Sequence, residues 1–289
     1  MSRCLPVALV QTEPLPAGAP FTRFAEEVEA VLGRFPGTRL IVYPELHLYG
    51  ESTEDIGLAE PLDGPRGSAL AELAASLDIW LVPGTLLETA EGGGMHNTAV
   101  VYSPQGRLVA AYRKCFPWRP YEPYRPGTEF VVFDIPEIGR FGLSICYDTW
   151  FPELSRQLAW LGAEAIIAPT RTTTSDRAQE LILTRANAIA NQVYVLSPNI
   201  AGPLGVGQSL IADPEGRVRV DAGRSAEVLT DVIDLDEVSR VREYGTAGLN
   251  RIWSQFRPDD RQLELPAYAG RIDPATWHPG AATNPADSR

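Results

Sequence analysis

Gly142-Leu-Ser-Ile-Cys-Tyr-Asp-Thr-Trp-Phe-Pro-Glu153 joins an apolar run to the start of a helix, with a cysteine between them. Residues 141–145 predict a buried strand, and Pro152 is typical of a first helical residue because its ring fixes a helical φ. Strand ends beside helix starts are where α/β proteins place reactive groups. The N–H groups of the turn and the helix dipole favour a thiolate, so Cys146 is a candidate nucleophile. A small core residue fits this segment equally well, because free cysteine is among the most buried residue types.

Apolar runs of strand length alternate with helical patterns along most of the chain. Strand patterns lie at residues 7–10, 40–43, 79–82, 130–133, 165–168, 193–196 and 228–233, and helical patterns at 21–35, 68–77, 152–162 and 176–191. Two pairs of runs, 97–102 with 108–112 and 209–212 with 218–220, are typical of hairpins. An arginine-containing segment, 235–244, follows the last strand.

Strands mixed with helices, without an obvious linker, predict a single α/β domain over residues 1–256. Residues 257–289 are dominated by Pro, Gly, Asp and Ala. We expect them to form an irregular C-terminal tail.

The charge balance and the cysteines exclude several classes of partner. The chain has 37 acidic and 25 basic residues, a net charge of −12, and no cluster of basic residues offsets it. Nucleic acid and membrane surfaces are therefore not expected partners. No apolar run approaches the roughly 20 residues that span a bilayer, and the run at 4–10 is too short for a signal peptide. Cys4, Cys115 and Cys146 lack a metal-binding spacing and are odd in number, so we expect no metal and a cytoplasmic location.

A cysteine nucleophile needs a base, and histidine is the usual one. His47 is the best placed of the three histidines because it follows the strand at 40–43, whereas His96 follows a glycine run and His278 lies in the tail. The same strand end carries Glu45, a carboxylate that is costly there unless it is paired or solvated. Glu45 is therefore a candidate base, although a glutamate in a loop is most often solvated.

A loop rich in proline and aromatic residues follows the strand at 108–112. It runs Tyr112-Arg-Lys-Cys-Phe-Pro-Trp-Arg-Pro-Tyr-Glu-Pro-Tyr-Arg-Pro-Gly127. Lys114 closes the strand; such a lysine is most often solvated, but near a thiolate it binds an oxyanion. Glu122 lies in the middle of the loop, where a charge needs nearby partners. Cys115 is expected to be structural or to line a pocket.

Three motifs in this order resemble the nitrilase superfamily of carbon–nitrogen hydrolases. They are Pro44-Glu45, Tyr112-Arg-Lys114, and Ile145-Cys-Tyr-Asp148 with Phe151-Pro-Glu153. The flanks match as well, since residues 97–102 resemble the strand before the family's lysine and residues 162–169 resemble the strand after its cysteine. The resemblance runs from about residue 7 to residue 232.

The loop that contains Glu122 is similar to the lysine–Pro-Trp–glutamate–Pro-Gly loop of the aliphatic amidase and formamidase branch. The chain is shorter than those amidases. It also lacks the Trp-Glu pair that directly follows the cysteine of typical nitrilases, because Tyr147 and Asp148 occupy these positions. Amide hydrolysis is therefore expected rather than nitrile hydrolysis.

The resemblance implies a four-layer α-β-β-α sandwich and assigns a role to each polar residue. Glu45 is the base, Cys146 the nucleophile, and Lys114 with the backbone N–H of Tyr147 binds the oxyanion, while Glu122 takes the role of the family's second glutamate. The expected reaction hydrolyses a small-molecule amide through a thioester and releases ammonia, with no metal or cofactor. The family usually forms dimers or larger assemblies, so a homodimer or higher homo-oligomer is expected.

Several residues near the motifs are candidates for the wall of a substrate pocket. They are Tyr49, Trp118, Tyr121, Trp150 and Thr170. For any one of them, an ordinary position in the core or at the surface is an equally good interpretation. Asp148 and Arg156 are expected to be structural.

Three other functions stay open besides that of a short-chain amidase. An N-carbamoyl amine or amino-acid hydrolase needs a cation for the substrate carboxylate, for which Arg171 is the candidate. A catalytically silent binding protein is disfavoured because all four site positions have competent residues. A thiol protease that uses His47 as its base is the remaining alternative.

Overall fold

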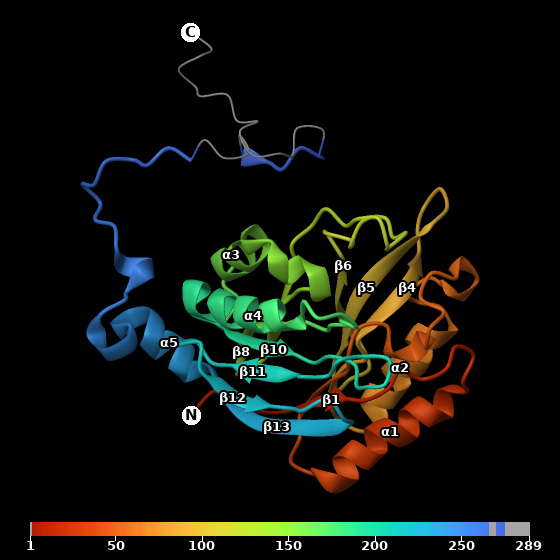
Figure 1. The fold of residues 1–289 in the computed structure, drawn as a ribbon. Coiled ribbons are helices and arrows are strands. Elements are labelled where there is room, and N and C mark those ends of the chain that lie inside the picture. Colours follow the sequence, from red (N-terminus) through yellow and green to blue (C-terminus); the bar gives the residue numbers. More distant parts are fainter. Residues whose placement is uncertain (1, 266–269, 275–289) are drawn as a thin grey trace.

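The computed structural model describes residues 2–265 and 270–274 and has two β-sheets between helices (Figure 1). The first sheet has seven strands. They are, in spatial order, β13 (Glu227–Asp234), β1 (Cys4–Gln11), β2 (Leu40–Val42), β3 (Trp80–Val82), β5 (Met95–Tyr102) and β4 (Thr85–Thr89), with β6 (Leu108–Arg113) also paired to β5. Strands β1, β2 and β3 are parallel, and β13 pairs with β1 in the antiparallel sense.

The second sheet has six strands. They are β12 (Val218–Asp221), β11 (Leu210–Ala212), β10 (Tyr194–Ser197), β9 (Ala165–Ile167), β8 (Gly139–Leu143) and β7 (Val132–Ile135), again in spatial order. Its central strands β8, β9 and β10 are parallel, so both sheets have a parallel centre and antiparallel edges.

Strand β1 shows why both faces of the first sheet are buried. Leu5, Val7 and Leu9 belong to one hydrophobic cluster, which also contains side chains of the second sheet. Ala8 and Val10 point to the opposite face and belong to another cluster. A strand that buries both faces reads as a continuous apolar run, and this is the pattern that the sequence has here.

Four helices cover the outer faces of the two sheets. Helices α1 (Phe21–Arg34) and α2 (Pro65–Ser76) pack on the first sheet, while α3 (Pro152–Trp160) and α4 (Arg177–Asn191) pack on the second. The two pairs lie on opposite sides of the molecule in Figure 1. Between the sheets, the rings of Trp80 and Phe133 stack with their centroids 6.3 Å apart. The predicted four-layer α-β-β-α sandwich is therefore confirmed.

The carboxyl ends of the strands bring distant segments of the chain together. Glu45 follows β2, Lys114 follows β6, and Cys146 begins the short helix η3 (Cys146–Trp150) just after β8. The N–H of Glu45 donates to the carbonyl of Thr170, which follows β9, across 3.3 Å. This bond ties the carboxyl end of one sheet to that of the other.

Two elements differ from the sequence prediction. Strand β4 was not predicted, because Thr-Leu-Leu-Glu-Thr has neither strict alternation nor a long β-branched run. The segment 235–244 is a helix, α5 (Leu235–Tyr244), whose start is capped by the Asp234 side chain accepting from the N–H of Asp236.

Only part of the predicted tail is described. Residues 257–265 contain no helix or strand and extend away from the sheets in Figure 1, whereas residues 275–289, including His278, lie outside the described part of the chain. Within the described residues, no helix has the length and apolar character needed to cross a bilayer.

Candidate active site

Glu45 is a buried carboxylate held at the end of β2. The next residue, Leu46, has a left-handed backbone with φ of 54°, which turns the chain sharply after the strand. Oε1 of Glu45 accepts from Nζ of Lys114 at 3.0 Å and from Nδ2 of Asn97 at 2.7 Å. The burial that made a carboxylate unexpected at this position is thus compensated by an ion pair and a hydrogen bond.

Lys114 lies between two carboxylates. Its Nζ donates to Glu45 and, at 2.8 Å, to Oε1 of Glu122, and its side chain is completely buried. It is also the only lysine in the sequence. Burial lowers the pKa of Lys114, but the carboxylates of Glu45 and Glu122 outweigh burial and raise this pKa well above its ordinary value. The two carboxylates therefore favour the charged form of Lys114.

Glu122 is fixed by the loop that contains it. Its Oε2 accepts from the backbone N–H of Trp118 at 2.6 Å while Oε1 accepts from Lys114. Burial raises the pKa of Glu122, Lys114 opposes the shift, and the nearby charge of Glu45 adds to it. The loop closes at Gly127, where a Cβ would lie 2.2 Å from the carbonyl oxygen of Arg113, so only glycine fits.

Cys146 has a left-handed backbone with φ of 47°, which is rare for a residue other than glycine. Its N–H donates to the carbonyl of Pro169 at 3.0 Å, and its Sγ lies 4.0 Å from Oγ1 of Thr172. Such a turn presents the sulfur at the strand end, and strained conformations of this kind cluster at functional sites.

The surroundings of Cys146 favour its thiol over the thiolate. Burial and the charge of Glu45 raise its pKa well above the ordinary thiol value, against the opposing effect of Lys114. The turn and the helix dipole, which were expected to favour a thiolate, do not decide the pKa of this thiol. Desolvation by the surrounding core and the nearby carboxylates outweigh these weaker dipoles.

Asp148 is structural, as predicted. Its carboxylate accepts from the hydroxyl of Tyr112 at 2.8 Å and from the N–H groups of Ile145 and Phe116, each at 2.9 Å. It thereby connects the strand before Lys114 with the turn that holds Cys146. Burial raises the pKa of Asp148 to about 7.

Three polar residues of the site were missed from sequence. Asn97 contacts Glu45, Thr172 contacts Cys146, and Glu180 accepts a hydrogen bond from Thr172. Asn97 had a signal, because an amide inside the buried run at 97–102 needs a partner. Thr172 and Glu180 had none, since a threonine in a loop and a glutamate on a helix are ordinary surface residues.

The proposed pocket residues separate into two groups. Tyr49 lies in the core on the α2 side, where its hydroxyl accepts from Arg66 at 2.6 Å and from the N–H of Leu87 at 3.0 Å. Its assignment to the pocket is therefore a misassignment of a core tyrosine. Trp118 and Tyr121 lie together on the Glu122 loop, with ring centroids 4.4 Å apart and Tyr121 mostly exposed.

Trp150 ends η3, and Thr170 and Arg171 lie in the segment that follows β9. The Trp150 indole N–H is buried and has no hydrogen-bond partner, while Thr170 is held through its backbone to Glu45. Nη2 of Arg171 donates to the carbonyl of Gly50 at 2.5 Å, and its Nη1 is buried without a partner.

His47 belongs to the layer of α1. Its Nε2 pairs with Glu27 at 2.8 Å, and its ring packs against the rings of Phe24 and Tyr43. The structure therefore does not bring His47 to Cys146 as the base of a thiol protease.

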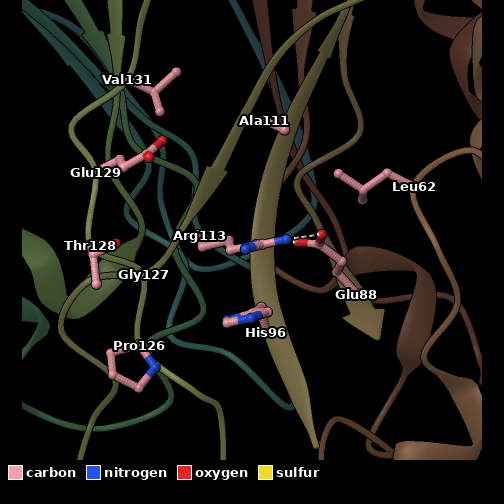
Figure 2. A pocket seen from close by; sticks show the side chains of 10 residues that line it. All are labelled: Leu62, Glu88, His96, Ala111, Arg113, Pro126, Gly127, Thr128, Glu129 and Val131. Carbon is pink, nitrogen blue, oxygen red and sulfur yellow. Dashed lines mark hydrogen bonds and ion pairs between the residues drawn. The ribbon is translucent and has the colours of Figure 1, made fainter. Parts of the chain in front are cut away.

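A separate surface pocket of about 330 Å³ lies beside β5 and β6 (Figure 2). Its most buried charge, Glu88, is paired with Arg113 at 2.6 Å and accepts from Thr98 at 2.6 Å. None of the four polar residues Glu45, Lys114, Glu122 and Cys146 lines it.

Within the described residues, one group of acidic side chains is close enough to share a cation. It consists of Asp213, Glu215 and Glu237. Arg217 and Arg240 pair with its glutamates, so arginines already neutralise this group.

The chain was compared with protein families and with known proteins. The model of the carbon–nitrogen hydrolase family matches residues 6–243. The chain belongs to this family. The carbon–nitrogen hydrolases that resemble it include a formamidase of Bacillus thuringiensis (strain Al Hakam), which is 32% identical over 214 residues, or 69% of this chain and 64% of the formamidase. The aligned region thus spans less than two thirds of that relative.

Solved structures of carbon–nitrogen hydrolases agree with the fold. Nit3 of Saccharomyces cerevisiae, a member of branch 10 of the nitrilase superfamily, is 30% identical with a TM-score of 0.76, over 83% of this chain and 93% of Nit3. A carbon–nitrogen hydrolase of Helicobacter pylori G27 is 25% identical with a TM-score of 0.72, over 84% of this chain and 93% of the other. The resemblance inferred from the three motifs is confirmed.

Proposed function

We propose that the protein hydrolyses the carbon–nitrogen bond of a small amide through a thioester on Cys146, and releases ammonia and a carboxylic acid. The observation that carries this proposal is the buried Lys114 ammonium, 3.0 Å from Glu45 and 2.8 Å from Glu122, beside a cysteine held in a left-handed turn. A buried cation with two carboxylates next to a thiol supplies both a base and charge stabilisation for acyl transfer.

In the first step, Glu45 accepts the thiol proton while Sγ of Cys146 attacks the amide carbonyl carbon. The carbonyl π electrons move to oxygen and form a tetrahedral oxyanion. Lys114 stabilises this charge, together with the N–H of Tyr147. Tyr147 lies in the first turn of η3, where backbone N–H groups have no intrahelical acceptor.

In the second step, the oxyanion reforms the carbonyl and the carbon–nitrogen bond breaks. Protonated Glu45 donates its proton to the leaving nitrogen, so ammonia departs and Glu45 is a carboxylate again. Water then attacks the thioester, with Glu45 taking the water proton. The carbon–sulfur bond breaks, and the proton returns to sulfur. Glu122 holds Lys114 in place throughout.

The similarity to formamidases supports a short acyl group. We propose formamide and other short aliphatic amides as the first substrates to test. Nitriles are a weaker choice, because Tyr147 and Asp148 follow the cysteine. A silent binding protein has less support, since the charged residues that the reaction needs are all present and in contact.

The test is ammonia release from amides, N-carbamoyl compounds and nitriles. We expect release from short amides, and its loss in Cys146→Ala. Cys115→Ala is the matched control, because Cys115 is a half-buried thiol in the neighbouring loop whose pKa is raised to about 11, mainly by burial. Undiminished turnover by Cys146→Ala, or no turnover of any of these compounds by the wild type, contradicts the proposal.

One observation favours a second candidate, an N-carbamoyl amine or amino-acid hydrolase. Nη1 of Arg171 is buried without a partner in the segment that follows Pro169 and Thr170. An unpaired buried guanidinium nitrogen is costly, and a substrate carboxylate is its natural partner. Release of carbon dioxide together with ammonia identifies this activity. Arg171→Met then raises KM for substrates with a carboxylate and leaves uncharged amides unaffected.

We also propose a homo-oligomeric state and a cytoplasmic location. Trp160 and Ile182, on the neighbouring helices α3 and α4, are 72% and 67% exposed, and a second copy of the chain would remove them from water. All three cysteines are free, as is typical of reducing compartments.

A further inference from the structure

A buried chain of polar groups leads away from the sulfur of Cys146. Oγ1 of Thr172 lies 4.0 Å from Sγ, and its hydroxyl donates to Oε2 of Glu180 at 2.5 Å. Oε2 of Glu180 also pairs with Nη1 of Arg177 at 3.2 Å. Thr172, Glu180 and Arg177 are each no more than 5% exposed, so this chain of groups is shielded from water.

The hydrogen of the Thr172 hydroxyl is committed to Glu180. A hydroxyl has one hydrogen and two lone pairs, so the oxygen faces the sulfur as an acceptor only. Such an oxygen can accept a weak hydrogen bond from the S–H of a thiol. It has no hydrogen left to donate to a thiolate.

Thr172 has no freedom to leave this position. Its N–H donates to Oδ1 of Asn199 at 2.8 Å, and its carbonyl accepts from Nδ2 of the same side chain at 3.2 Å. Arg177 is fixed in turn by a 2.9 Å bond from Nη2 to the carbonyl of Gln208. The contact to the sulfur is therefore built into the fold.

We propose that Thr172 and Glu180 are positioning residues for the nucleophile, which orient the sulfur of Cys146 and keep it protonated until Glu45 removes the proton. This inference rests on the proposed role of Cys146 as nucleophile. It adds that two charges near the sulfur act in opposite directions. The Lys114 ammonium favours the thiolate, and the Glu180 carboxylate favours the thiol.

The electrostatics of the site agree with this arrangement. The negative charge of Glu180 adds to burial and to Glu45 in raising the pKa of Cys146. A protonated sulfur is what the reaction needs at its start, since the same proton later leaves with ammonia. A free thiolate beside an ionised Glu45 lacks that proton.

The first test replaces the charge of Glu180 and keeps its shape. In Glu180→Gln, we expect the pH midpoint of Cys146 alkylation by iodoacetamide to fall by roughly one unit, because a like charge no longer opposes the thiolate. Peptide mass spectrometry follows Cys146, with Cys115 as the internal reference. The alkaline limb of kcat/KM should move to lower pH by the same amount.

Glu88→Gln is the matched control. Glu88 is likewise a buried glutamate that accepts from a threonine and pairs with an arginine, but it lies in the surface pocket of Figure 2. We expect this variant to leave the alkylation profile of Cys146 unchanged. An unchanged profile in Glu180→Gln, or equal shifts in both variants, overturns the proposal.

The second test concerns orientation. Thr172→Val keeps the shape and removes the acceptor oxygen, so we expect kcat to fall about tenfold to a hundredfold with KM within about twofold, as for a misplaced reacting group. Thr172→Ser should restore most of kcat. Equal kcat in the valine variant and the wild type contradicts the positioning role. Alkylation needs no substrate, so a failure of the proposed amidase activity is distinguishable from a failure of this inference.

Discussion

Lys114 is the residue on which the charge balance of the site depends. A buried cation is costly in free energy unless it is paired and hydrogen-bonded, and Lys114 is both. Glu45 and Glu122 contact it from different segments, one after β2 and the other in the loop after β6. The position of this one ammonium therefore fixes the separation of the two carboxylates.

Because Lys114 is the only lysine, its protonation can be followed as a single signal. In protein labelled with ¹³C at the lysine ε-carbon, we expect one resonance that does not titrate at the ordinary lysine pKa of about 10.4. The two carboxylates paired with the ammonium favour its charged form, and this raises the pKa of Lys114. NMR between about pH 7 and pH 11 makes the measurement.

Two comparisons make this titration decisive. In urea, the same resonance should titrate near about 10.4. In Glu122→Gln, one stabilising carboxylate is neutral and the midpoint should move down toward that value. A folded wild-type midpoint at or below about 10.4 contradicts the buried ion-pair geometry.

At the residue scale, the sequence predicted which charged groups meet. It did not predict which neighbouring side chains contact them and hold them in place. Glu45, Lys114 and Cys146 each lie at a strand end, and strand ends of one fold converge on the same edge. The burial of Tyr49 and the contact between Thr172 and Glu180 depend on which loop folds over which. Neither periodicity nor composition encodes such contacts between loops and helices.

At the scale of elements, Asp148 joins two segments that meet only in the folded chain. It accepts from Tyr112 at the end of β6 and from Ile145 before the nucleophile. An asparagine has one acceptor oxygen where the carboxylate has two. Asp148→Asn should therefore leave a buried donor unsatisfied and lower the free energy of unfolding by about 1–3 kcal/mol.

The loss in Asp148→Asn should depend on pH. The folded pKa of Asp148 is raised to about 7, whereas the unfolded pKa is about 3.9. The folded state therefore binds the proton of Asp148 more tightly than the unfolded state does. The stabilisation that results from this proton is complete below about pH 4 and is lost as the pH rises through about 7. Urea unfolding at several pH values should show the free energy of unfolding of the wild type falling over that range relative to that of Asp148→Asn, which has no carboxyl group at this position to titrate. A constant difference contradicts this assignment.

Gly84 sets the approach of the turn after β3 to the end of β2. Its φ is 90°, and a Cβ there would lie 1.8 Å from the carbonyl oxygen of Pro44, the residue before Glu45. Gly84→Ala should therefore push the strand end away. We expect a loss of stability of at least about 1–3 kcal/mol and a fall in kcat, because Glu45 moves with Pro44.

The control for Gly84 is a glycine in open space. Gly33 lies in α1, and a Cβ there would meet nothing within 4 Å. Gly33→Ala should stabilise the protein by roughly 0.5–1 kcal/mol through helix propensity alone. Thermal unfolding and ammonia release compare the two variants, and equal effects exclude a special role of Gly84.

Element prediction from the sequence was strongest where burial makes a pattern. The continuous apolar run of β1 and the amphipathic pattern of α1 both gave elements close to the observed ones. Strand β4 was missed because its five residues are held in a strand by pairing with β5. Local β-propensity does not show such a pairing.

At the scale of the whole molecule, the site is assembled by the contact of two sheets. Glu45 and Lys114 belong to the first sheet, Cys146 and Thr172 follow strands of the second, and the bond from Glu45 to Thr170 crosses between them. The reactive geometry is therefore a product of the entire sandwich. In the described residues 257–265, the N–H of Asp260 donates to the carbonyl of Arg257, and the N–H of Arg257 donates to the Asp260 carboxylate. These residues contribute none of the groups named above.

The exposed surface of α3 and α4 is a candidate interface between copies of the chain. Ile182 and Ile189 lie seven residues apart on α4, so they share one face, and they are 67% and 45% exposed. Trp160 at the end of α3 adds a third exposed apolar side chain. Covering such a patch removes apolar surface from water, and we expect a second copy of the chain to cover it.

Sedimentation velocity at micromolar concentration should therefore detect a dimer or a larger species of the wild type. The double variant Ile182→Asp/Ile189→Asp should shift it to the monomer, because two carboxylates would be buried without partners at the interface. Ile56→Asp is the control, since Ile56 is 56% exposed on a short helix elsewhere. A monomeric wild type, or an assembly that both variants leave intact, shows that this face is not the interface. Because α3 directly follows the turn that holds Cys146, a monomeric variant that keeps full ammonia release would also show that the nucleophile needs no support from a neighbouring subunit.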